Sequence, residues 1–237
     1  MWLKSARIAT TSRPGQYVMV SCGPDTLLRR PISIHQVDDT RLALLFSVIG
    51  RGTQWLSERK SGDEVDLLGP LGNGFTLLPE SQRILLVAGG MGIAPLAFLA
   101  NVAIRQRVKT TLLMGASSAA HLLGLPTDEP SSINIMKTTD DGSLGLKGLV
   151  TDMLVEQCRI DQADQIFACG PVPMYQTMSQ MPELINKPVQ VSLEVRMGCG
   201  LGICYGCTIK TRQGLKQVCH DGPIFDLNDI FWDEVIC

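Results

Sequence analysis

The pattern of apolar residues changes once along this chain, near residue 80, and that change restricts the fold more than any other feature. Before it, short apolar runs alternate with turn residues such as Pro14-Gly15 and Gly69-Pro70, which is the spacing of an all-β barrel or sandwich. After it, strand-like runs alternate with helical segments, which predicts a doubly wound parallel sheet. The 237 residues therefore comprise an antiparallel β unit followed by an α/β unit.

The expected elements follow from this pattern. In the first unit we expect strands at 17–22, 32–37, 42–49 and 64–68, with a helical insert at 53–60. In the second we expect strands at 84–88, 110–114, 133–136 and 165–168, with helices at 94–105, 149–158 and 174–181. Beyond these come a strand at 189–195 and a short β pair, 208–211 with 216–218.

Charge and hydropathy exclude several classes of partner. Lysine and arginine number 21 against 23 aspartates and glutamates, without the basic excess that binding to nucleic acid requires. Lys4 and Arg7 precede any apolar run of signal-peptide length, so we expect no export and a cytoplasmic location. The uncharged stretch 84–104 is interrupted by glycines 89–92 and by Pro95, so it predicts a strand, a turn and a helix rather than a membrane span.

Four late cysteines form a spaced cluster. Cys199, Cys204, Cys207 and Cys219 follow the pattern C-x4-C-x2-C-x11-C, whose first part is the spacing of plant-type ferredoxins. The glycines between them let the backbone curl around a cluster with its N–H groups toward sulfur. The spacing predicts a 2Fe-2S centre, and the alternative is a structural zinc ion held by the same thiolates.

The remaining C-terminal sequence is too short to be stable by core burial alone, so the cysteine site is expected to hold it together. Cys22, Cys158 and Cys237 lie outside the cluster. They are expected to be small apolar residues without a redox or metal role.

A glycine turn follows the first strand of the α/β unit. Gly89, Gly90 and Gly92 lie between this strand and a helix that has Pro95 in its first turn, so free N–H groups there predict a pyrophosphate site. Pro95 stands where the dinucleotide fingerprint has its third glycine. A second turn, Cys169-Gly170-Pro171, ends another strand, and its alternative role is tight packing around an inert thiol.

The residues that follow the strand expected at 110–114 bear on whether the chain binds NAD or NADP. Ser117 and Ser118 stand there, so this position offers neither the acidic residue that binds the ribose of NAD nor a basic residue for the 2′-phosphate of NADP. The sequence favours NAD(H) over NADP(H).

Taken in order, these motifs resemble those of known oxidoreductases. A β unit followed by a nucleotide sheet with the Gly89–Pro95 and Cys169–Pro171 turns resembles the ferredoxin reductase family. The runs Arg30-Pro31-Ile32-Ser33 and Gly50-Arg51-Gly52-Thr53, with the cysteines and Val218–Phe225, make nearly the whole chain similar to the electron transfer subunits of NAD-dependent, type B dihydroorotate dehydrogenases.

The resemblance implies three domains. These are a flavin-binding antiparallel β-barrel over residues 1–80, a doubly wound NAD-binding α/β domain over 81–186 and a small 2Fe-2S subdomain over 187–237. Little sequence precedes Pro14, so we expect a shortened N-terminus and a missing first barrel strand.

The resemblance also implies which residues hold the cofactors. FAD would lie on Arg30, Pro31, Ile32, Ser33, Leu45, Phe46, Ser47, Gly52 and Thr53, with Arg30 near its phosphates and Ser33 near the reactive ring edge. Ser47 stands where many relatives have a basic residue, so it would act through its backbone. NAD would lie on Gly89, Gly90, Gly92, Cys169, Gly170 and Pro171. The cluster would lie on Cys199, Cys204, Cys207 and Cys219.

The function implied is electron transfer in pyrimidine biosynthesis. In this family an FMN-containing catalytic subunit oxidises dihydroorotate, and electrons run from FMN through the 2Fe-2S centre and FAD to NAD+, in a heterotetramer of two subunits of each kind. None of the three histidines lies in a nucleophile or metal motif, so no catalytic side chain is expected. The alternatives are a flavin subunit of a hydrogenase, sulfite reductase or NADH–ferredoxin complex, and a zinc-stapled nucleotide-binding regulator.

Overall fold

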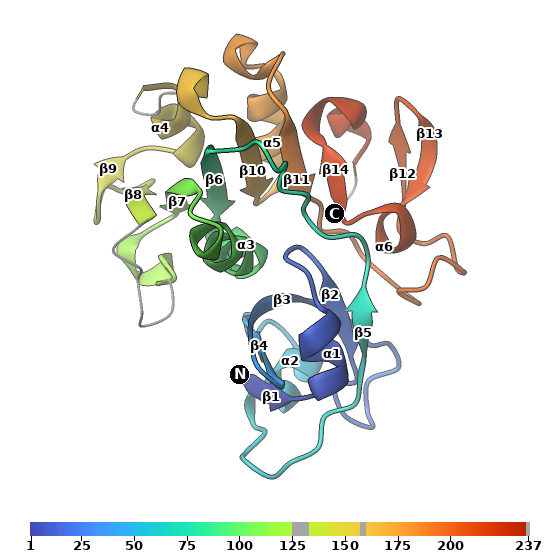
Figure 1. The fold of residues 1–237 in the computed structure, drawn as a ribbon. Helices are drawn as coiled ribbons and strands as arrows, with labels where there is room; N and C mark the ends of the chain where they lie inside the picture. The colour runs from blue at the N-terminus through green and yellow to red at the C-terminus, as the bar shows by residue number, and fades with distance from the viewer. Residues whose placement is uncertain (125–132, 157–159, 236–237) are drawn as a thin grey trace.

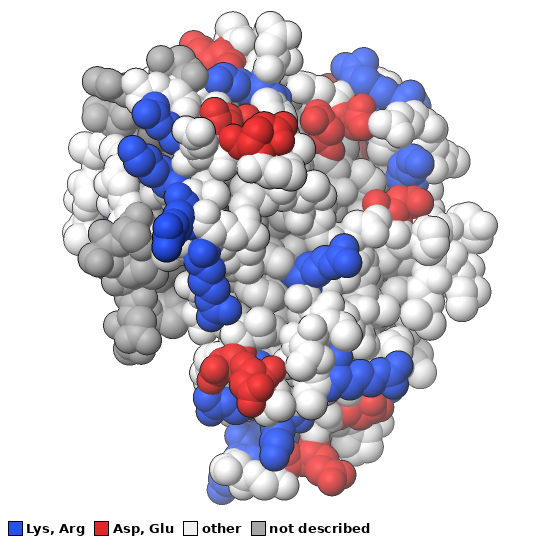
Figure 2. Space-filling model, in the orientation of Figure 1, with Lys and Arg blue, Asp and Glu red and all other residues white. Residues whose placement is uncertain are grey.

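The computed structural model describes residues 1–124, 133–156 and 160–235. Figure 1 shows an antiparallel sheet at the bottom, a parallel sheet with helices above it, and the C-terminal segment at the right beside both. Among the described residues, no helix combines the length and the apolar surface needed to cross a bilayer. Basic and acidic side chains are interspersed over the face in Figure 2.

The first sheet is an open barrel of five strands in the order β1-β4-β3-β2-β5. All four neighbouring pairs are antiparallel, as the sequence predicts. Its strands are β1 (Trp2–Lys4), β2 (Tyr17–Val20), β3 (Arg30–Asp38), β4 (Arg41–Leu44) and β5 (Leu67–Leu71). Helices α1 (Ala6–Thr11) and α2 (Arg51–Ser57) accompany it. Strand β1, which the sequence analysis did not predict, pairs with β4 at the edge of the sheet. The expectation of a missing first barrel strand stays a prediction.

Three predicted boundaries in the barrel are wrong. The strand expected at 42–49 ends at Leu44, since β1 and β3 offer no pairing partners beyond that residue. The strand expected at 64–68 is β5, which begins at Leu67, because residues 63, 64 and 66 are exposed and acidic. The helical insert begins earlier than 53, because the Thr53 hydroxyl accepts hydrogen bonds from the amides of Ile49 and Gly50 and so caps α2.

The second sheet has seven strands in the order β14-β11-β10-β6-β7-β8-β9. Every neighbouring pair is parallel except β14 with β11, which confirms the predicted doubly wound parallel sheet. Its strands are β6 (Arg83–Gly89), β7 (Lys109–Ala116), β8 (Ile133–Thr139), β9 (Leu146–Lys147), β10 (Gln165–Cys169), β11 (Val189–Ser192) and β14 (Ile224–Asp226). The helices are α3 (Ile93–Arg105), α4 (Val150–Glu156) and α5 (Val172–Ser179).

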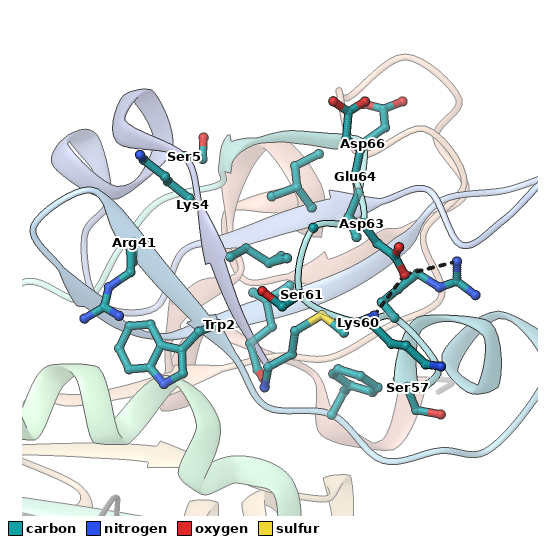
Figure 3. A pocket seen from close by; sticks show the side chains of 18 of the residues that line it. Trp2, Lys4, Ser5, Arg41, Ser57, Lys60, Ser61, Asp63, Glu64 and Asp66 are labelled. Atoms are coloured by element: carbon teal, nitrogen blue, oxygen red, sulfur yellow. Dashed lines mark hydrogen bonds and ion pairs between the residues drawn. The ribbon is translucent and has the colours of Figure 1, made fainter.

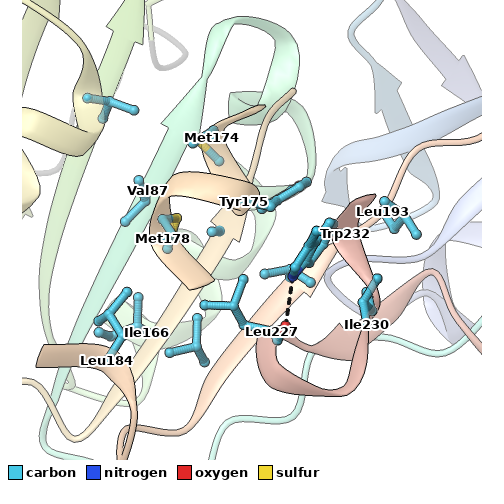
Figure 4. Packing of buried hydrophobic residues seen from close by; sticks show 14 of the residues in the cluster. Val87, Ile166, Met174, Tyr175, Met178, Leu184, Leu193, Leu227, Ile230 and Trp232 are labelled. Carbon is cyan, nitrogen blue, oxygen red and sulfur yellow. Dashed lines mark hydrogen bonds between the residues drawn. The ribbon is translucent and has the colours of Figure 1, made fainter. Parts of the chain in front are cut away.

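Side-chain alternation along β6 explains its unbroken apolar run. Ile84 and Leu86 pack in the core that contains α3, whereas Leu85 and Val87 pack in the core that contains α4 and α5. Because successive side chains point to opposite faces of a sheet, a strand covered by helices on both faces must be apolar at every position. Figure 4 shows the second of these cores, where Val87 lies beside Met178 of α5 and Tyr175 of the same helix lies beside Trp232.

The C-terminal segment is not confined to its own subdomain. It contributes the hairpin β12 (Thr208–Thr211) and β13 (Gly214–Gln217), helix α6 (Val218–Asp221), and also the strands β11 and β14 of the parallel sheet. The strand expected at 189–195 ends at Ser192. The division at residues 80 and 186 stays a prediction, and the sheet continues across the second of these boundaries.

Other boundaries shift by a few residues. Helices predicted at 174–181 and 149–158 are α5 and α4, and Pro171 stands at the N-cap of α5, which begins at Val172. Cys158 and Cys237, predicted to be inert apolar residues, lie outside the described residues.

A buried histidine joins the barrel to the parallel sheet. His35 of β3 is 8% exposed, and its Nδ1 atom lies 2.9 Å from the carbonyl oxygen of Ala94 in α3. Burial lowers the pKa of this imidazole below its usual value, which the Ala94 contact opposes in part. The folded state therefore favours the neutral ring.

We expect His35 to make the fold less stable in acid. Because its pKa is lower in the folded than in the unfolded chain, the unfolded state binds more protons as pH falls through about 6.5. Replacing His35 with Asn, which can still donate to Ala94 but does not titrate, should reduce the loss of Tm between about pH 7.5 and about pH 5.5. The exposed His121→Asn serves as control, and an unchanged pH dependence in His35→Asn would contradict this assignment.

Candidate functional site

The four cysteine thiols lie in two pairs. Cys199, Cys204 and Cys207 lie on the loop between β11 and β12, and Cys219 lies in α6. The Sγ atoms of Cys207 and Cys219 are 3.2 Å apart, and the Cys204 side chain helps to lower the pKa of the Cys199 thiol. Among the described residues, no three His, Cys, Asp or Glu side chains surround a common point. One pair of thiolates for each of two irons is the ligand set that a 2Fe-2S centre requires.

Backbone amides are directed at these sulfurs. The amide of Leu201 donates to Cys199 Sγ at 3.4 Å, that of Gly202 to Cys219 Sγ at 3.1 Å, and that of Cys219 to Cys207 Sγ at 3.4 Å. Gly202 has a φ of 74°, a conformation that a residue with a Cβ rarely adopts. N–H donors stabilise the negative charge of a thiolate-bound cluster.

Cys199 and Cys219 differ in their readiness to lose a proton. Amides of Leu201 and Cys204 lower the pKa of Cys199 to about 6. Burial, followed by the hydrogen bond with Cys207, raises the pKa of Cys219 to about 12. Metal binding must therefore displace a proton from Cys219, whereas Cys199 already favours the thiolate at neutral pH.

The cysteine loop rests on strand β2 of the barrel. The Tyr17 hydroxyl donates to the carbonyl oxygens of Cys219 at 3.2 Å and Gly200 at 3.4 Å. Gly200 has a φ of 73°, and a Cβ there would lie 2.6 Å from Cγ of Met19. On its outer side the loop exposes apolar side chains, those of Leu201, Ile203 and Tyr205, which are 47%, 71% and 70% exposed.

The two predicted nucleotide turns meet at the centre of the parallel sheet. A Cβ at Gly92 would lie 1.8 Å from the carbonyl oxygen of Cys169, so the turns touch through their backbones. The strand order reverses between β6 and β10, which these turns follow. Ligands of open α/β sheets bind at such a switch point, outside the carboxyl ends of the strands.

A cavity of about 690 Å³ opens at this point. Of the residues predicted to bind NAD, all but Cys169 line it, namely Gly89, Gly90, Gly92, Gly170 and Pro171. Cys169 itself is fully buried, and burial raises the pKa of its thiol. The Cys169 carbonyl packs on Gly92. The alternative role of this turn, tight packing around an inert thiol, therefore accounts for the Cys169 side chain.

Two acidic residues in the cavity wall were not among the predicted site residues. Asp140 follows β8, and Glu194 follows β11. Water reaches Glu194 through the cavity, yet the surrounding protein desolvates its carboxylate and raises its pKa. A search for polar residues directly after every parallel strand, rather than after β7 alone, would have found both.

The predicted flavin residues gather along the first half of β3. The register pairs Arg30 with Val20, Ser33 with Tyr17 and Ile34 with Leu44, so residues 45–47 lie beside Ser33. The side chain of Ile32 is 6% exposed in the barrel core, so Ile32 could contact a flavin only through its backbone. Pro31 and Ser33 point to the opposite face of the sheet.

Arg30 lies against the first turn of α2. A Cβ at Gly52 would lie 3.4 Å from Nε of Arg30 and 3.1 Å from Cβ of Cys22, which explains the glycine. The Thr53 hydroxyl donates to the Gly50 carbonyl, so Thr53 offers a phosphate its backbone amide. Together the guanidinium and the free amides form a site that fits a pyrophosphate.

A larger hollow lies elsewhere in the barrel. It measures about 1470 Å³ and is bounded by β1, the end of α2 and the segment before β5, as Figure 3 shows. Its wall mixes Lys4, Arg41 and Lys60 with Asp63 and Glu64. Leu45 and Phe46 reach it, but Arg30, Ser33, Gly52 and Thr53 do not, so it is not the predicted flavin site.

Comparisons with known proteins agree with this geometry. Residues 194–231 match the family described as the iron-sulfur cluster binding domain of dihydroorotate dehydrogenase B, and residues 86–180 match the oxidoreductase NAD-binding domain. The electron transfer subunit of dihydroorotate dehydrogenase B (NAD(+)) from Desulforamulus reducens is 39% identical over 234 residues, which is 95% of this chain and 89% of that protein. The chain belongs to this family.

Other relatives support the same assignment. The subunit of the same name from Clostridium acetobutylicum is 38% identical over 90% of this chain and 84% of that protein. A solved structure of an NADH-dependent reduced ferredoxin–NADP oxidoreductase covers 98% of this chain and 84% of its own, with a TM-score of 0.85 and 29% identity. The predicted oxidoreductase class and its cofactors, FAD, a 2Fe-2S cluster and NAD, are confirmed for this family.

The flavin site gives a testable prediction. Arg30→Ala should weaken FAD binding about ten- to hundredfold, because a hydrogen bond to a charged group contributes about 1.5–3 kcal/mol. Arg29→Ala is the matched control, since the neighbouring guanidinium pairs with Asp66 instead. The measurement is the ratio of flavin absorbance to protein after dialysis, and equal flavin loss in both variants would count against the site.

The cysteine pairs give a second prediction. Cys204→Ser should abolish the paramagnetic signal of a reduced 2Fe-2S centre, because one iron loses a thiolate. Cys22→Ala should leave that signal intact, since Cys22 is buried in the barrel. Iron and acid-labile sulfide should fall with the signal, and their retention in Cys204→Ser would show that this thiol is not a ligand.

Proposed function

We propose that this chain takes electrons from an FMN-containing dihydroorotate dehydrogenase catalytic subunit and delivers them to NAD+. The observation that carries the proposal is the match to electron transfer subunits over most of the chain, together with two thiol pairs in an iron-sulfur domain. When bound, the cluster supplies one-electron transfer and FAD supplies the exchange between single electrons and hydride.

The contacts of strand β2 support a short route between cluster and flavin. Tyr17 pairs with Ser33 in the barrel sheet, and its hydroxyl donates to the carbonyl of Cys219. One strand thus separates the proposed ring-edge residue of the flavin site from a proposed cluster ligand. Burial of Tyr17 at 3% exposure keeps water out of this junction.

The outer side of the cysteine loop supports a partner surface beside the cluster. Leu201, Ile203 and Tyr205 lie between or beside the proposed ligands and are largely exposed. Exposed apolar and aromatic side chains are typical of interfaces, where their burial stabilises the complex. A catalytic subunit docked here would bring its cofactor close to the thiolates.

At the other end of the route the cavity above the parallel sheet would hold NAD. Backbone amides of the turn after β6 face a pyrophosphate, and the touching turns leave no room for side chains between them. No general acid or base is needed, because hydride passes between the cofactors and the chain only orients them.

The assembly and its location form part of the proposal. We expect two copies of this chain with two catalytic subunits, the stoichiometry that the sequence resemblance implies. A cytoplasmic location agrees with thiols that must stay reduced to hold iron. No nucleic acid or membrane has a role in this scheme.

The direct test is reconstitution. The holoprotein is mixed anaerobically with an FMN-containing dihydroorotate dehydrogenase subunit, and NADH formation from dihydroorotate is followed at 340 nm. We expect NADH only when both proteins are present, and at least tenfold less with Ile203→Asp, which places a charge in the proposed interface. Absence of coupled NADH formation, with ferredoxin replacing dihydroorotate as an effective donor, would instead support the NADH–ferredoxin alternative, whose fold is similar.

A further inference from the structure

The cavity above the parallel sheet is lined by acidic side chains and not by basic ones. Among the described residues its wall contains Asp140 and Glu194 and no lysine, arginine or histidine. These acids stand at opposite ends, because β7, β6 and β10 separate the strands that they follow. Four strand spacings of about 4.8 Å place the two ends about 19 Å apart, the scale of an extended dinucleotide.

The barrel determines which end faces the flavin. It contacts the α/β unit at the start of α3, where His35 meets Ala94, and at the outer strand β14, where a Cβ at Gly15 would lie 3.0 Å from Ile224. Because α3 follows the central strand β6, both contacts lie on the β11 side of β8. A nicotinamide that exchanges hydride with a flavin on the barrel therefore lies toward Glu194. The adenosine half then lies at the far end, beside Asp140.

The backbone of Asp140 is fixed before any ligand binds. Its amide donates to the carbonyl of Ala116 at 3.1 Å, which ties the end of β8 to the end of β7. In the same loop, the Asp141 carboxylate accepts from the amide and hydroxyl of Ser143, whose Oγ accepts from the amide of Ala119 at 2.7 Å. A loop held at both ends loses little entropy on binding.

The side chain of Asp140, by contrast, is left available. It is exposed, and within the described residues its carboxylate oxygens have no hydrogen-bond or ion-pair partner. An ionised carboxylate is purely an acceptor, so it suits a ribose that donates from its 2′- and 3′-hydroxyls. The same charge repels a phosphate esterified at the 2′ position.

We propose that Asp140 selects NAD(H) over NADP(H) by accepting hydrogen bonds from the adenosine ribose and repelling a 2′-phosphate. The proposal rests on the proposed function of this cavity as the dinucleotide site. Acidic ribose ligands usually follow the second strand of a dinucleotide fold. Here Ser117 and Ser118 occupy that position, and the acid comes from the next strand.

The test measures binding directly, without turnover. The holoprotein is titrated calorimetrically with ADP-ribose and with 2′-phospho-ADP-ribose, and the ratio of the two Kd values measures the selection. We expect the wild type to prefer ADP-ribose. Asp140→Asn should reduce that preference at least tenfold, about 1.4 kcal/mol, because it removes the charge and weakens the acceptor. Asp140→Glu should keep most of the preference.

A matched control separates the local effect of the Asp140 carboxylate from the effect of a changed net charge. Asp39→Asn removes the same charge at the β3–β4 turn, where a φ of 51° suits asparagine, and should leave the ratio unchanged. If the wild type prefers ADP-ribose and Asp140→Asn shows the same Kd ratio to within about twofold, the proposed role of Asp140 is overturned, while the proposed NAD site stands. If the wild type binds neither probe, the proposed dinucleotide site fails, and this inference fails with it.

Discussion

Strand β2 is the element on which the arrangement of the proposed flavin and cysteine sites depends. On one side it pairs with β3, which contributes Arg30 and Ser33, and through Tyr17 and Met19 it supports the loop that contains the cysteines. All four of its residues are buried. Electron transfer needs cofactors held at fixed separations more than it needs reactive side chains. A buried strand shared by two sites meets that need, because neither site can shift without disturbing the same core.

The parallel sheet imposes a second constraint, through the backbone contact between its two central turns. Gly92 and the Cys169 carbonyl approach so closely that no side chain fits between them. The helix α3 therefore begins directly over the switch point, with its free amides at the cavity. This contact explains how a turn without the third glycine of the usual fingerprint still borders a cavity, the proposed nucleotide site, since Gly170 and Pro171 complete the wall.

Local sequence predicted most of this architecture, and the failures have physical causes. The run 84–88 and the helix after it were predicted because burial on both faces requires apolar residues throughout. Strand β1 was missed because three residues carry too little pattern, and its pairing with β4 is decided by tertiary contacts. The cysteines were predicted from spacing alone. Asp140 was missed because it directly follows the third strand of the unit, and only the sheet register brings it beside Ala116.

Strand β14 has a consequence for synthesis of the chain. It covers the free edge of β11 with residues that come after every one of the four cysteines. A polypeptide still emerging from the ribosome therefore leaves that edge open until the four cysteines have been made. Unpaired edges invite association with other chains. Closure of the parallel sheet therefore comes only after all four cysteines have been synthesised, and a nascent chain that stalls before β14 exposes an edge prone to aggregation.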